Sequence, residues 1–362
     1  MRLEELDFDI PEALIAQSPV EPRDSCRLMH LLADGGCHHG VFSDLPGRLT
    51  AGDTLVFNDS RVLPARVQAR KTTGGGVELL FLRPADGENA AEGELWEALA
   101  RPSHRLHPGD RLTLSGGDRV ALRDLLGEGR WVVEGPYGRS LVAIMEAEGR
   151  LPLPPYIKTY PEEPSSYQTV YASVPGSSAA PTAGLHFTPG LLESLDRRGV
   201  NSAYVTLHVG LDTFQPIREQ VVEQHRIHRE TYSVSPEALR TIRATVVSGN
   251  RLVAVGTTAS RVLETLARDG LLDDARPPVP VCGSTDIFIT PGYRFQAVDV
   301  LLTNLHLPRS TVLLMTMAFA GVDRLRLAYA EAIQLGYRFF SFGDAMLIEP
   351  LVPRTSSRQE GM

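Results

Sequence analysis

Hydrophobic and polar positions change their spacing twice along the 362-residue chain, which divides it into three stretches. The opening stretch is mixed and ends in a segment at 53–57 (DTLVF) that predicts a strand. In the middle stretch, short alternating runs predict strands at 77–82, 95–99, 111–114 and 130–133. Clusters of Gly, Pro and Asp separate these runs, which is typical of a small antiparallel sheet or barrel.

The last stretch alternates predicted strands with capped helices. Residues 188–199 begin with Thr and Pro and end with Gly, which is the residue order of a capped helix. Residues 235–249 repeat this order, and 258–270 has the apolar spacing of a further helix. Apolar runs at 201–211 and 251–255 predict the intervening strands. This alternation indicates an α/β architecture.

The simplest assembly of these elements is an α/β fold made of two domains. We expect a barrel-like α/β body formed by residues 1–65 and 150–362. Residues 66–149 would form an inserted small antiparallel β-barrel domain, and the proline-rich segment 151–155 would be the hinge that returns to the body.

Composition adds few constraints. Hydrophobic residues make up 43% and charged residues 22%, which is ordinary for a globular protein. The net charge of −8 argues against a dedicated nucleic-acid module but leaves room for a local basic surface. Three cysteines without a CxxC pair favour a reducing compartment. An acidic N-terminus and the lack of about 20 consecutive apolar residues predict a cytoplasmic protein without a membrane segment.

Polar residues gather after the predicted strands, where open α/β folds bind their ligands. The segment 179–187 (AAPTAGLHF) presents Thr182 and His186 on an apolar turn, although a purely structural turn is an equal alternative. In the strand that follows, alternation places Thr206 and His208 on one face, with Asp212 at the mouth of a polar cavity.

The segment 225–230 (HRIHRE) has HxxH spacing, which would place His225 and His228 on one helical face and suggests a metal site. No HExxH pattern or neighbouring Cys supports zinc. Catalytic or phosphate-binding roles for His228 and Glu230 are favoured, and an exposed polar helix is the structural alternative.

Further polar candidates come from the C-terminal half. Asn304 and His306 lie between a strand and a predicted helix start, and Asp344 is expected as a strand-end carboxylate. The segment 255–258, which includes Thr257, opens a helix and could bind an anion through backbone N–H groups. Cationic candidates are Arg61, Arg66 and Arg261. No GxGxxG, Walker A or GxSxG motif occurs.

At these motifs the chain resembles the S-adenosylmethionine:tRNA ribosyltransferase-isomerase family of queuosine biosynthesis. The resemblance runs nearly end to end through VFNDSRV at 56–62, PLPPYI at 152–157, APTAGLHF at 180–187, VTLHVG at 205–210, AVGTT at 254–258, TN and HLP within 303–308, and GDAM at 343–346. It implies an α/β body with an inserted small β-barrel.

The resemblance also implies a reaction. The ribosyl part of S-adenosylmethionine would be transferred to 7-aminomethyl-7-deazaguanine at the tRNA wobble position and isomerised, which gives epoxyqueuosine-tRNA, adenine and methionine. S-adenosylmethionine would be a consumed substrate, and neither a metal nor another cofactor would be needed. The partners would be tRNA and S-adenosylmethionine, with no membrane, and the protein would be a monomer.

The resemblance assigns the candidate residues to two groups. The catalytic group would be His186, His208, His228 and Asp344. The substrate-binding group would be Arg61, Arg66, Thr182, Thr206, Asp212, Glu230, Thr257, Arg261, Asn304 and His306.

The chain departs from the family pattern at three positions, and two other functions stay open. Thr290 and Leu305 stand where aromatic residues are typical, and Ala259 replaces a usual Ser. The loss of an aromatic residue at Leu305 would alter stacking on a base. The alternatives are a metal-dependent hydrolase, which metal analysis would reveal, and a tRNA-binding paralogue without catalytic activity.

Overall fold

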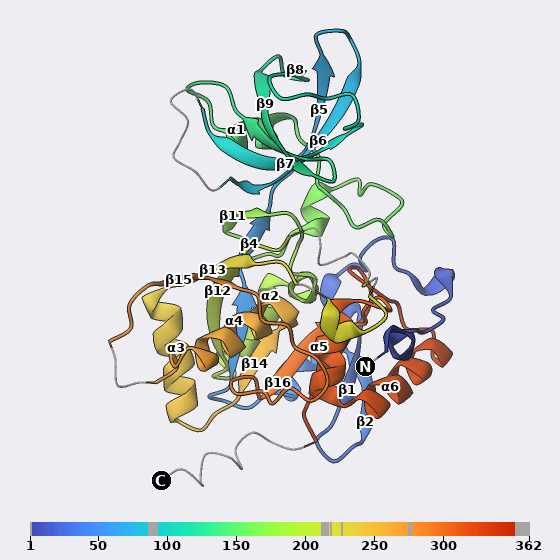
Figure 1. The fold of residues 1–362 in the computed structure, drawn as a ribbon. Coiled ribbons are helices and arrows are strands. Elements are labelled where there is room, and N and C mark those ends of the chain that lie inside the picture. The colour runs from blue at the N-terminus through green and yellow to red at the C-terminus, as the bar shows by residue number, and fades with distance from the viewer. Residues whose placement is uncertain are drawn as a thin grey trace. The chain divides into compact units, whose positions relative to one another are not determined.

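Nine strands form the sheet of the α/β body, in the order β15-β13-β12-β3-β14-β16-β17-β1-β2 (Figure 1). The computed structural model describes residues 2–85, 93–210, 217, 219–225, 227–273 and 277–351. The central strands run parallel to one another: β12 (Asn201–Leu207), β3 (Thr54–Asn58), β14 (Leu252–Val255) and β16 (Val300–Asn304). β3, β14 and β16 are buried along their whole length, as expected for parallel strands that are covered on both faces.

The strands that flank the central four, β17 with β1 on one side and β13 on the other, run in the opposite direction. β17 (Ala345–Ile348) is antiparallel to β16, and β1 (Arg27–Leu31) and β2 (Cys37–Val41) follow it to one edge. β13 (Glu230–Val234) and β15 (Val281–Thr285) complete the other edge. Because β17 reverses direction, its first residue, Ala345, is paired with Asn304, the last residue of β16.

Helices cover both faces of this sheet. Leu55, Phe57 and Val253 form a buried cluster with residues of α2 (Pro189–Arg197) and of the 3-10 helix η4 (Phe42–Gly47). Because side chains alternate between the two faces of a strand, the strand residues between these point to the other face of the sheet. That face packs against α3 (Pro236–Val247) and α4 (Gly256–Arg268).

The predicted helix caps are present. Thr188 Oγ1 accepts a hydrogen bond from the Leu191 amide, and Ser235 Oγ accepts one from the Ala238 amide.

Two predicted boundaries were wrong. α4 already begins at Gly256 because the first turn continues directly from β14, and β12 ends at Leu207 rather than at residue 211. Two more helices follow β16, α5 (Thr311–Ala320) and α6 (Val322–Gln334).

The second unit contains a closed antiparallel barrel with the strand order β10-β7-β6-β5-β8-β9. Its strands are β5 (Arg66–Lys71), β6 (Gly76–Pro84), β7 (Leu95–Arg101), β8 (Arg111–Leu114), β9 (Arg119–Gly127) and β10 (Arg130–Glu134). Alternate residues fill the interior, among them Phe81, Trp96 and Trp131. Helix α1 (Leu141–Glu148) follows the barrel strands, and β4 (Ser60–Val62) pairs with β11 (Val174–Ser177) in a separate two-stranded sheet.

The expected fold class is confirmed: a mixed α/β body with a large sheet, and a small closed antiparallel barrel. Only the small unit closes on itself, since the large sheet ends in β15 and β2. By contacts, one unit comprises residues 1–60, 155–174 and 180–362, and the other 61–154 and 175–179. The domain limits of 66 and 149 stay a prediction. Within the described ranges, no helix combines the length and apolar character that a membrane crossing requires.

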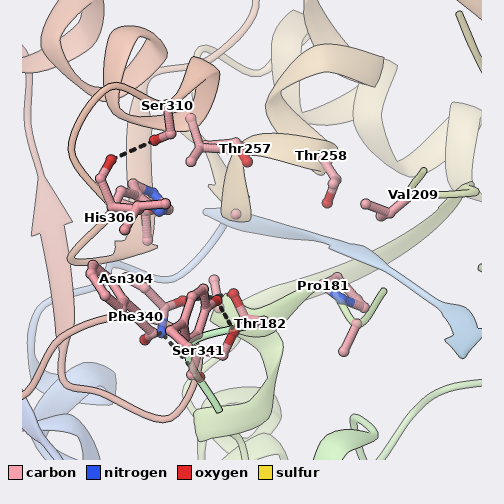
Figure 2. A pocket seen from close by; sticks show the side chains of 17 residues that line it. Pro181, Thr182, Val209, Thr257, Thr258, Asn304, His306, Ser310, Phe340 and Ser341 are labelled. Atoms are coloured by element: carbon pink, nitrogen blue, oxygen red, sulfur yellow. Dashed lines mark hydrogen bonds between the residues drawn. The ribbon is translucent and has the colours of Figure 1, made fainter. Parts of the chain in front are cut away.

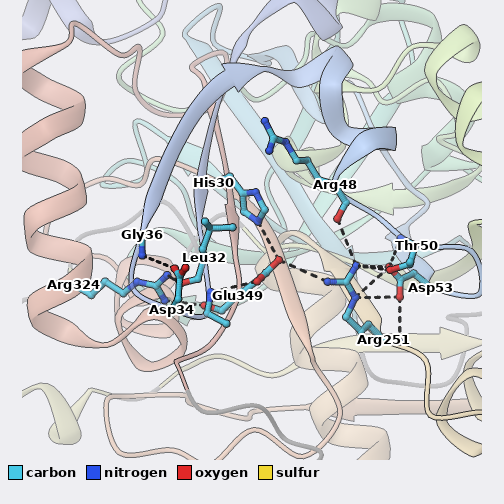
Figure 3. A network of polar contacts seen from close by, with 11 residues as sticks. His30, Leu32, Asp34, Gly36, Arg48, Thr50, Asp53, Arg251, Arg324 and Glu349 are labelled. Carbon is cyan, nitrogen blue, oxygen red and sulfur yellow. Dashed lines mark hydrogen bonds and ion pairs between the residues drawn. The ribbon is translucent and has the colours of Figure 1, made fainter.

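A polar network joins four strand ends at the edge of the sheet where β3 and β14 begin (Figure 3). Arg251 pairs with the buried Asp53, while Glu349 accepts from His30 Nε2 at 3.1 Å and lies 3.7 Å from Arg251. The Asp53 carboxylate raises the pKa of Arg251. This network belongs to the opposite end of β3 and β14 from the pocket described next.

Candidate functional site

A pocket lies where the parallel strands β14 and β16 end. The chain runs from β3 to β12 on one side and returns to β14 and β16 on the other, so the strand order changes direction at β3. Open α/β sheets bind ligands at such a point, outside the carboxyl ends of the strands. The empty space at this point amounts to about 630 Å³ when the part open to solvent is included.

Six segments of the α/β body supply the walls of the pocket (Figure 2). They are Tyr156, the 3-10 helix η6 (Thr182–His186) with the residues before it, the start of α4, the end of β16 with the loop to α5, the turn before β17, and Val209 after β12. The polar lining consists of hydroxyl, amide and imidazole groups: Tyr156, Thr182, Thr257, Thr258, Thr303, Asn304, His306, Ser310 and Ser341. Among the described residues that line it, Asp, Glu, Lys and Arg are absent.

Two helix N-termini open onto this pocket. Gly256, Thr257 and Thr258 form the first turn of α4, where no side chain caps the helix. Ser310 caps α5 by accepting from the Leu313 amide, and it donates to the Leu307 carbonyl at 2.6 Å. The free N–H groups and the dipole of an uncapped helix start favour an anionic group. The start of α4 is therefore suited to a carboxylate of the ligand.

A chain of hydrogen bonds leads from the pocket into the core. Thr182 Oγ1 donates to Asn304 Oδ1 at 3.3 Å, and Asn304 Nδ2 donates to the Phe340 carbonyl at 3.1 Å. The same Nδ2 lies 3.1 Å from His186 Nε2, so this ring nitrogen is the acceptor. The His186 proton then resides on Nδ1, which is 3.2 Å from Cys26 Sγ. His186 thus orients Asn304 from behind.

Burial keeps both histidines of this region neutral. It lowers the pKa of His186 to about 3, with further lowering by Arg23 and Arg338. Burial also lowers the pKa of His306 to about 3, and Thr303 Oγ1 lies 2.6 Å from its Nε2. His306 lines the pocket, whereas His186 is 4% exposed and does not. At neutral pH both rings therefore act as hydrogen-bonding groups without charge.

Unusual backbone conformations flank the pocket. Phe340 has a φ of 70° and Arg309 a φ of 56°, in the left-handed region that bulky residues rarely adopt. Gly184 is needed for space, since a Cβ there would lie 1.9 Å from the Tyr171 hydroxyl. Backbone strain of this kind persists where the surrounding structure holds it, often at functional sites.

A second polar cluster forms where β3 and β12 end. Asp59 accepts from Thr206 Oγ1 at 2.7 Å and from Ser173 Oγ at 2.9 Å. Burial lowers the pKa of His208, although Asp59 opposes this shift. The buried Nδ1 of His208 has no hydrogen-bond partner among the described residues, and the same holds for the Tyr171 hydroxyl and Thr258 Oγ1. Buried polar atoms without partners are candidates for ligand contacts.

Other candidates have partners that limit their roles. Glu230 and Arg261 form a buried ion pair, and Glu230 also accepts from the Gly210 amide at 2.9 Å. The prediction that Asp344 follows the end of a strand is wrong. Asp344 lies directly before β17, which is antiparallel to β16. Its carboxylate accepts from the Arg27 amide at 2.9 Å and from the Arg338 amide at 2.7 Å, so it holds the turn before β17.

The remaining candidates lie outside the pocket. Arg61 and Arg66 belong to the barrel unit, where they pair with Glu146 and Glu78. His225 and His228 do not lie on one helical face, because a 3-10 helix ends at Gln224 and residues 227–229 before β13 are not helical. His225 Nδ1 is instead 2.9 Å from Glu219. Asp212 lies outside the residues that the structure describes.

Metal-ligand side chains do not gather at the pocket. The group of three that the described residues offer lies on β2 and α6, away from the pocket lining. Leu305 is fully buried and does not line the pocket, so the expected loss of base stacking at this position is not supported by the structure.

Sequence reasoning missed several polar residues of this region: Cys26, Asp59, Tyr156, Tyr171, Thr258 and Ser310. Asp59 and Thr258 could have been suspected, since Asp59 follows a predicted strand and Thr258 belongs to the predicted helix start. Cys26 and Tyr171 carry no local signal. Their partners, His186 and Gly184, are distant in sequence.

The sequence comparisons identify the family of the chain. A family profile described as "Queuosine biosynthesis protein" matches residues 3–348. The chain belongs to this family. The S-adenosylmethionine:tRNA ribosyltransferase-isomerase of Rubrobacter xylanophilus is 50% identical over 96% of the chain and 98% of its own length. The protein of that name from Moorella thermoacetica is 47% identical over 96% of the chain and all of its own length.

A solved structure agrees with this assignment. The crystal structure of S-adenosylmethionine tRNA ribosyltransferase from Thermotoga maritima is 36% identical and has a TM-score of 0.53, with 95% of this chain and 99% of that chain covered. The resemblance inferred from the motifs is therefore confirmed, and the matches extend over 95–96% of the chain, a range that includes the residues of the barrel unit.

Proposed function

We propose that the protein transfers and isomerises the ribosyl moiety of S-adenosylmethionine onto 7-aminomethyl-7-deazaguanine at the tRNA wobble position. The products are epoxyqueuosine-tRNA, adenine and methionine. The observation that carries this proposal is the pocket of hydroxyl, amide and neutral imidazole groups in a chain that is about 50% identical to ribosyltransferase-isomerases along nearly its whole length.

The pocket chemistry fits S-adenosylmethionine. A ribose and a purine offer hydroxyl groups and ring nitrogens, which Thr182, Asn304 and Thr258 can bind as hydrogen-bond partners. The methionine carboxylate fits the uncapped start of α4. S-adenosylmethionine is consumed, so the proposal requires neither a metal nor a redox cofactor.

Proton transfer is the main chemical demand. The carbon beside the sulfonium loses a proton, which gives an ylide, and adenine takes up a proton as it leaves. The aminomethyl nitrogen then attacks the sugar carbon that adenine leaves, the ylide carbon closes the new ring, and a ribose oxygen displaces methionine from that carbon to form the epoxide. A base for the first step must be unprotonated at working pH and must have a ring nitrogen or oxygen atom that is not already engaged by another residue.

We assign this base role to His208 rather than to His186. His208 has a lowered pKa, and its Nδ1 has no partner among the described residues. Both ring nitrogens of His186 are occupied, by Asn304 and Cys26. His186 is a positioning residue in this scheme, and His306 contacts the substrate.

Asp344 is predicted from the sequence to be catalytic, and we assign it a positioning role instead. It holds the turn that carries Phe340 and Ser341. Glu230 and Arg261 have a structural role in this scheme. Glu230, paired with Arg261, accepts from the Gly210 amide and so holds the segment after β12 that contains Val209. His228 stays a candidate catalytic residue and Asp212 a candidate substrate contact, and Arg61 and Arg66 are candidates for tRNA phosphates.

Thr258→Val tests the pocket assignment. Its hydroxyl has no partner among the described residues, so the change should leave the unfolding free energy unchanged or higher while it lowers adenine release from S-adenosylmethionine and modified tRNA about 5- to 100-fold. Thr241→Val on α3 is the control. Equal adenine release by both variants and the wild type would refute the pocket as the S-adenosylmethionine site.

A further inference from the structure

Three side chains with metal-binding atoms meet outside the pocket, where strand β2 faces helix α6. Cys37 and His39 alternate along β2 and so share one face of this edge strand, and Glu331 lies on α6. Their ligand atoms all lie within 4.8 Å of one another. None of the three lines the pocket described above.

We propose that Cys37, His39 and Glu331 bind a zinc ion or a similar divalent metal ion, with a fourth position left to water. A thiolate, an imidazole and a carboxylate are the ligand types that zinc takes in proteins. Magnesium and calcium prefer an all-oxygen set, so the sulfur and nitrogen ligands select for a softer ion.

Two of the three distances between the ligand atoms are close to those of a tetrahedral site. Zinc bonds of about 2.3 Å to sulfur and about 2.0 Å to nitrogen and oxygen imply separations of about 3.5 Å for S···N and about 3.3 Å for N···O. Cys37 Sγ is 3.8 Å from His39 Nε2, and this Nε2 is 3.2 Å from Glu331 Oε1. The third pair, Cys37 Sγ and the Glu331 carboxylate, lies within 4.8 Å. An ion at the centre of this group would hold that pair about 3.5 Å apart.

The imidazole of His39 is also held in the orientation that a ligand requires. Its Nδ1 lies 2.7 Å from the Tyr337 hydroxyl, which directs Nε2 towards Cys37 and Glu331. Tyr337 is itself fixed: it is 1% exposed, and the Arg27 guanidinium lies over its ring at 4.1 Å. A hydrogen bond to the second ring nitrogen is the usual support of a metal-bound histidine.

The exposure of the cluster indicates an exchangeable ion. The side chains of His39 and Glu331 are 34% and 43% exposed, so an ion can reach them from solvent. When bound, the ion would connect edge strand β2 to α6 (Figure 1), in place of the present His39–Glu331 contact. The site would thus stabilise one border of the sheet.

Metal titration of the full-length protein tests this proposal directly. The protein, freed of metal with a chelator, is titrated with Co²⁺ to follow the thiolate charge-transfer absorption, and with Zn²⁺ in competition with a chromophoric chelator. We expect one equivalent of Zn²⁺ to bind, and Cys37→Ser, His39→Gln and Glu331→Gln each to weaken binding at least about tenfold. Tyr337→Phe should weaken it about 10- to 100-fold through the lost orientation of His39.

Matched variants keep the result interpretable. Cys282→Ser removes an exposed cysteine and His38→Gln removes the neighbouring histidine of β2, and neither should change Zn²⁺ affinity. Circular dichroism confirms folding, and Glu331→Gln serves as the decisive variant if a change in β2 unfolds the protein. Zn²⁺ affinity that is equal in Glu331→Gln and wild type, or absence of the cobalt thiolate band, would overturn the proposal.

Discussion

At the scale of single residues, the structure changes the role of the histidine that the sequence makes most conspicuous. His186 lies in the APTAGLHF motif, yet its ring contacts Cys26 and Asn304 and is 4% exposed. Its influence on the pocket passes through Asn304 to Thr182. The residue is therefore explained better by positioning than by proton transfer.

The low pKa of His186 predicts a dependence of stability on pH. The folded protein keeps this ring neutral down to about pH 3, while the unfolded chain takes up a proton near pH 6.5. Stability contributed by this neutral ring is present above pH 6.5 and is lost as the pH falls towards 3, by up to about 1.4 kcal/mol per pH unit.

Denaturant unfolding at pH 7, 6 and 5 checks this prediction. The helical circular dichroism signal is the suitable probe, because α2 to α6 belong to the α/β body. Between pH 6 and 5 the free energy of unfolding should fall more steeply for the wild type than for His186→Gln. His104→Gln, at an exposed histidine of the barrel unit, should keep the wild-type slope. Equal slopes in all three proteins would contradict the assigned neutral ring.

At the scale of elements, η6 is held by a close approach that only glycine allows. A Cβ on Gly184 would meet the Tyr171 hydroxyl at 1.9 Å, and Thr169 Cγ2 would lie 2.9 Å away. The conformation that presents Thr182 to the pocket therefore depends on a contact between η6 and the segment before β11.

A double-mutant cycle tests this contact. Gly184→Ala should destabilise the protein by about 1–3 kcal/mol through overpacking, and Tyr171→Phe should recover part of this loss because it removes the clashing oxygen. Gly190→Ala in α2, where a Cβ meets nothing within 4 Å, should be neutral or stabilising. Additive effects of the Gly184 and Tyr171 changes on the unfolding free energy would argue against direct contact.

The network at the far edge of the sheet gives a contrasting prediction. Asp53 is 2% exposed and pairs with Arg251, so Asp53→Asn should lower the free energy of unfolding by about 1–3 kcal/mol, because Arg251 keeps only the more distant carboxylate of Glu349. S-adenosylmethionine affinity, measured calorimetrically at a temperature where the variant is folded, should stay within about twofold of wild type. A large loss of affinity would show that the two ends of the sheet are coupled.

Local patterns predicted the elements better than the contacts between them. The caps at Thr188 and Ser235 and the alternating barrel strands are read from neighbouring residues, and the structure contains them. Asn304 and Thr182 were found because strand ends and unusual turns concentrate ligands. The Cys26–His186 contact joins residues 160 positions apart, and the direction of β17 depends on pairing with β16. Neither has a local sequence signal.

At the scale of the whole molecule, the described pocket lies entirely within the α/β body. Both tryptophans of the chain, Trp96 and Trp131, lie in the barrel unit. Spectroscopic probes can therefore follow the two units separately, with tryptophan fluorescence for the barrel and helical circular dichroism chiefly for the body.

The central claim is that S-adenosylmethionine donates its ribosyl part and keeps its methyl group on methionine. The most direct measurement uses S-adenosylmethionine labelled in the ribose or in the methyl carbon, with tRNA that carries 7-aminomethyl-7-deazaguanine and with unmodified tRNA as control. The account predicts ribose label in the modified tRNA alone, one adenine released for each label incorporated, and methyl label recovered in methionine. Methyl label in the tRNA, or tRNA binding without incorporation of either label, would contradict it.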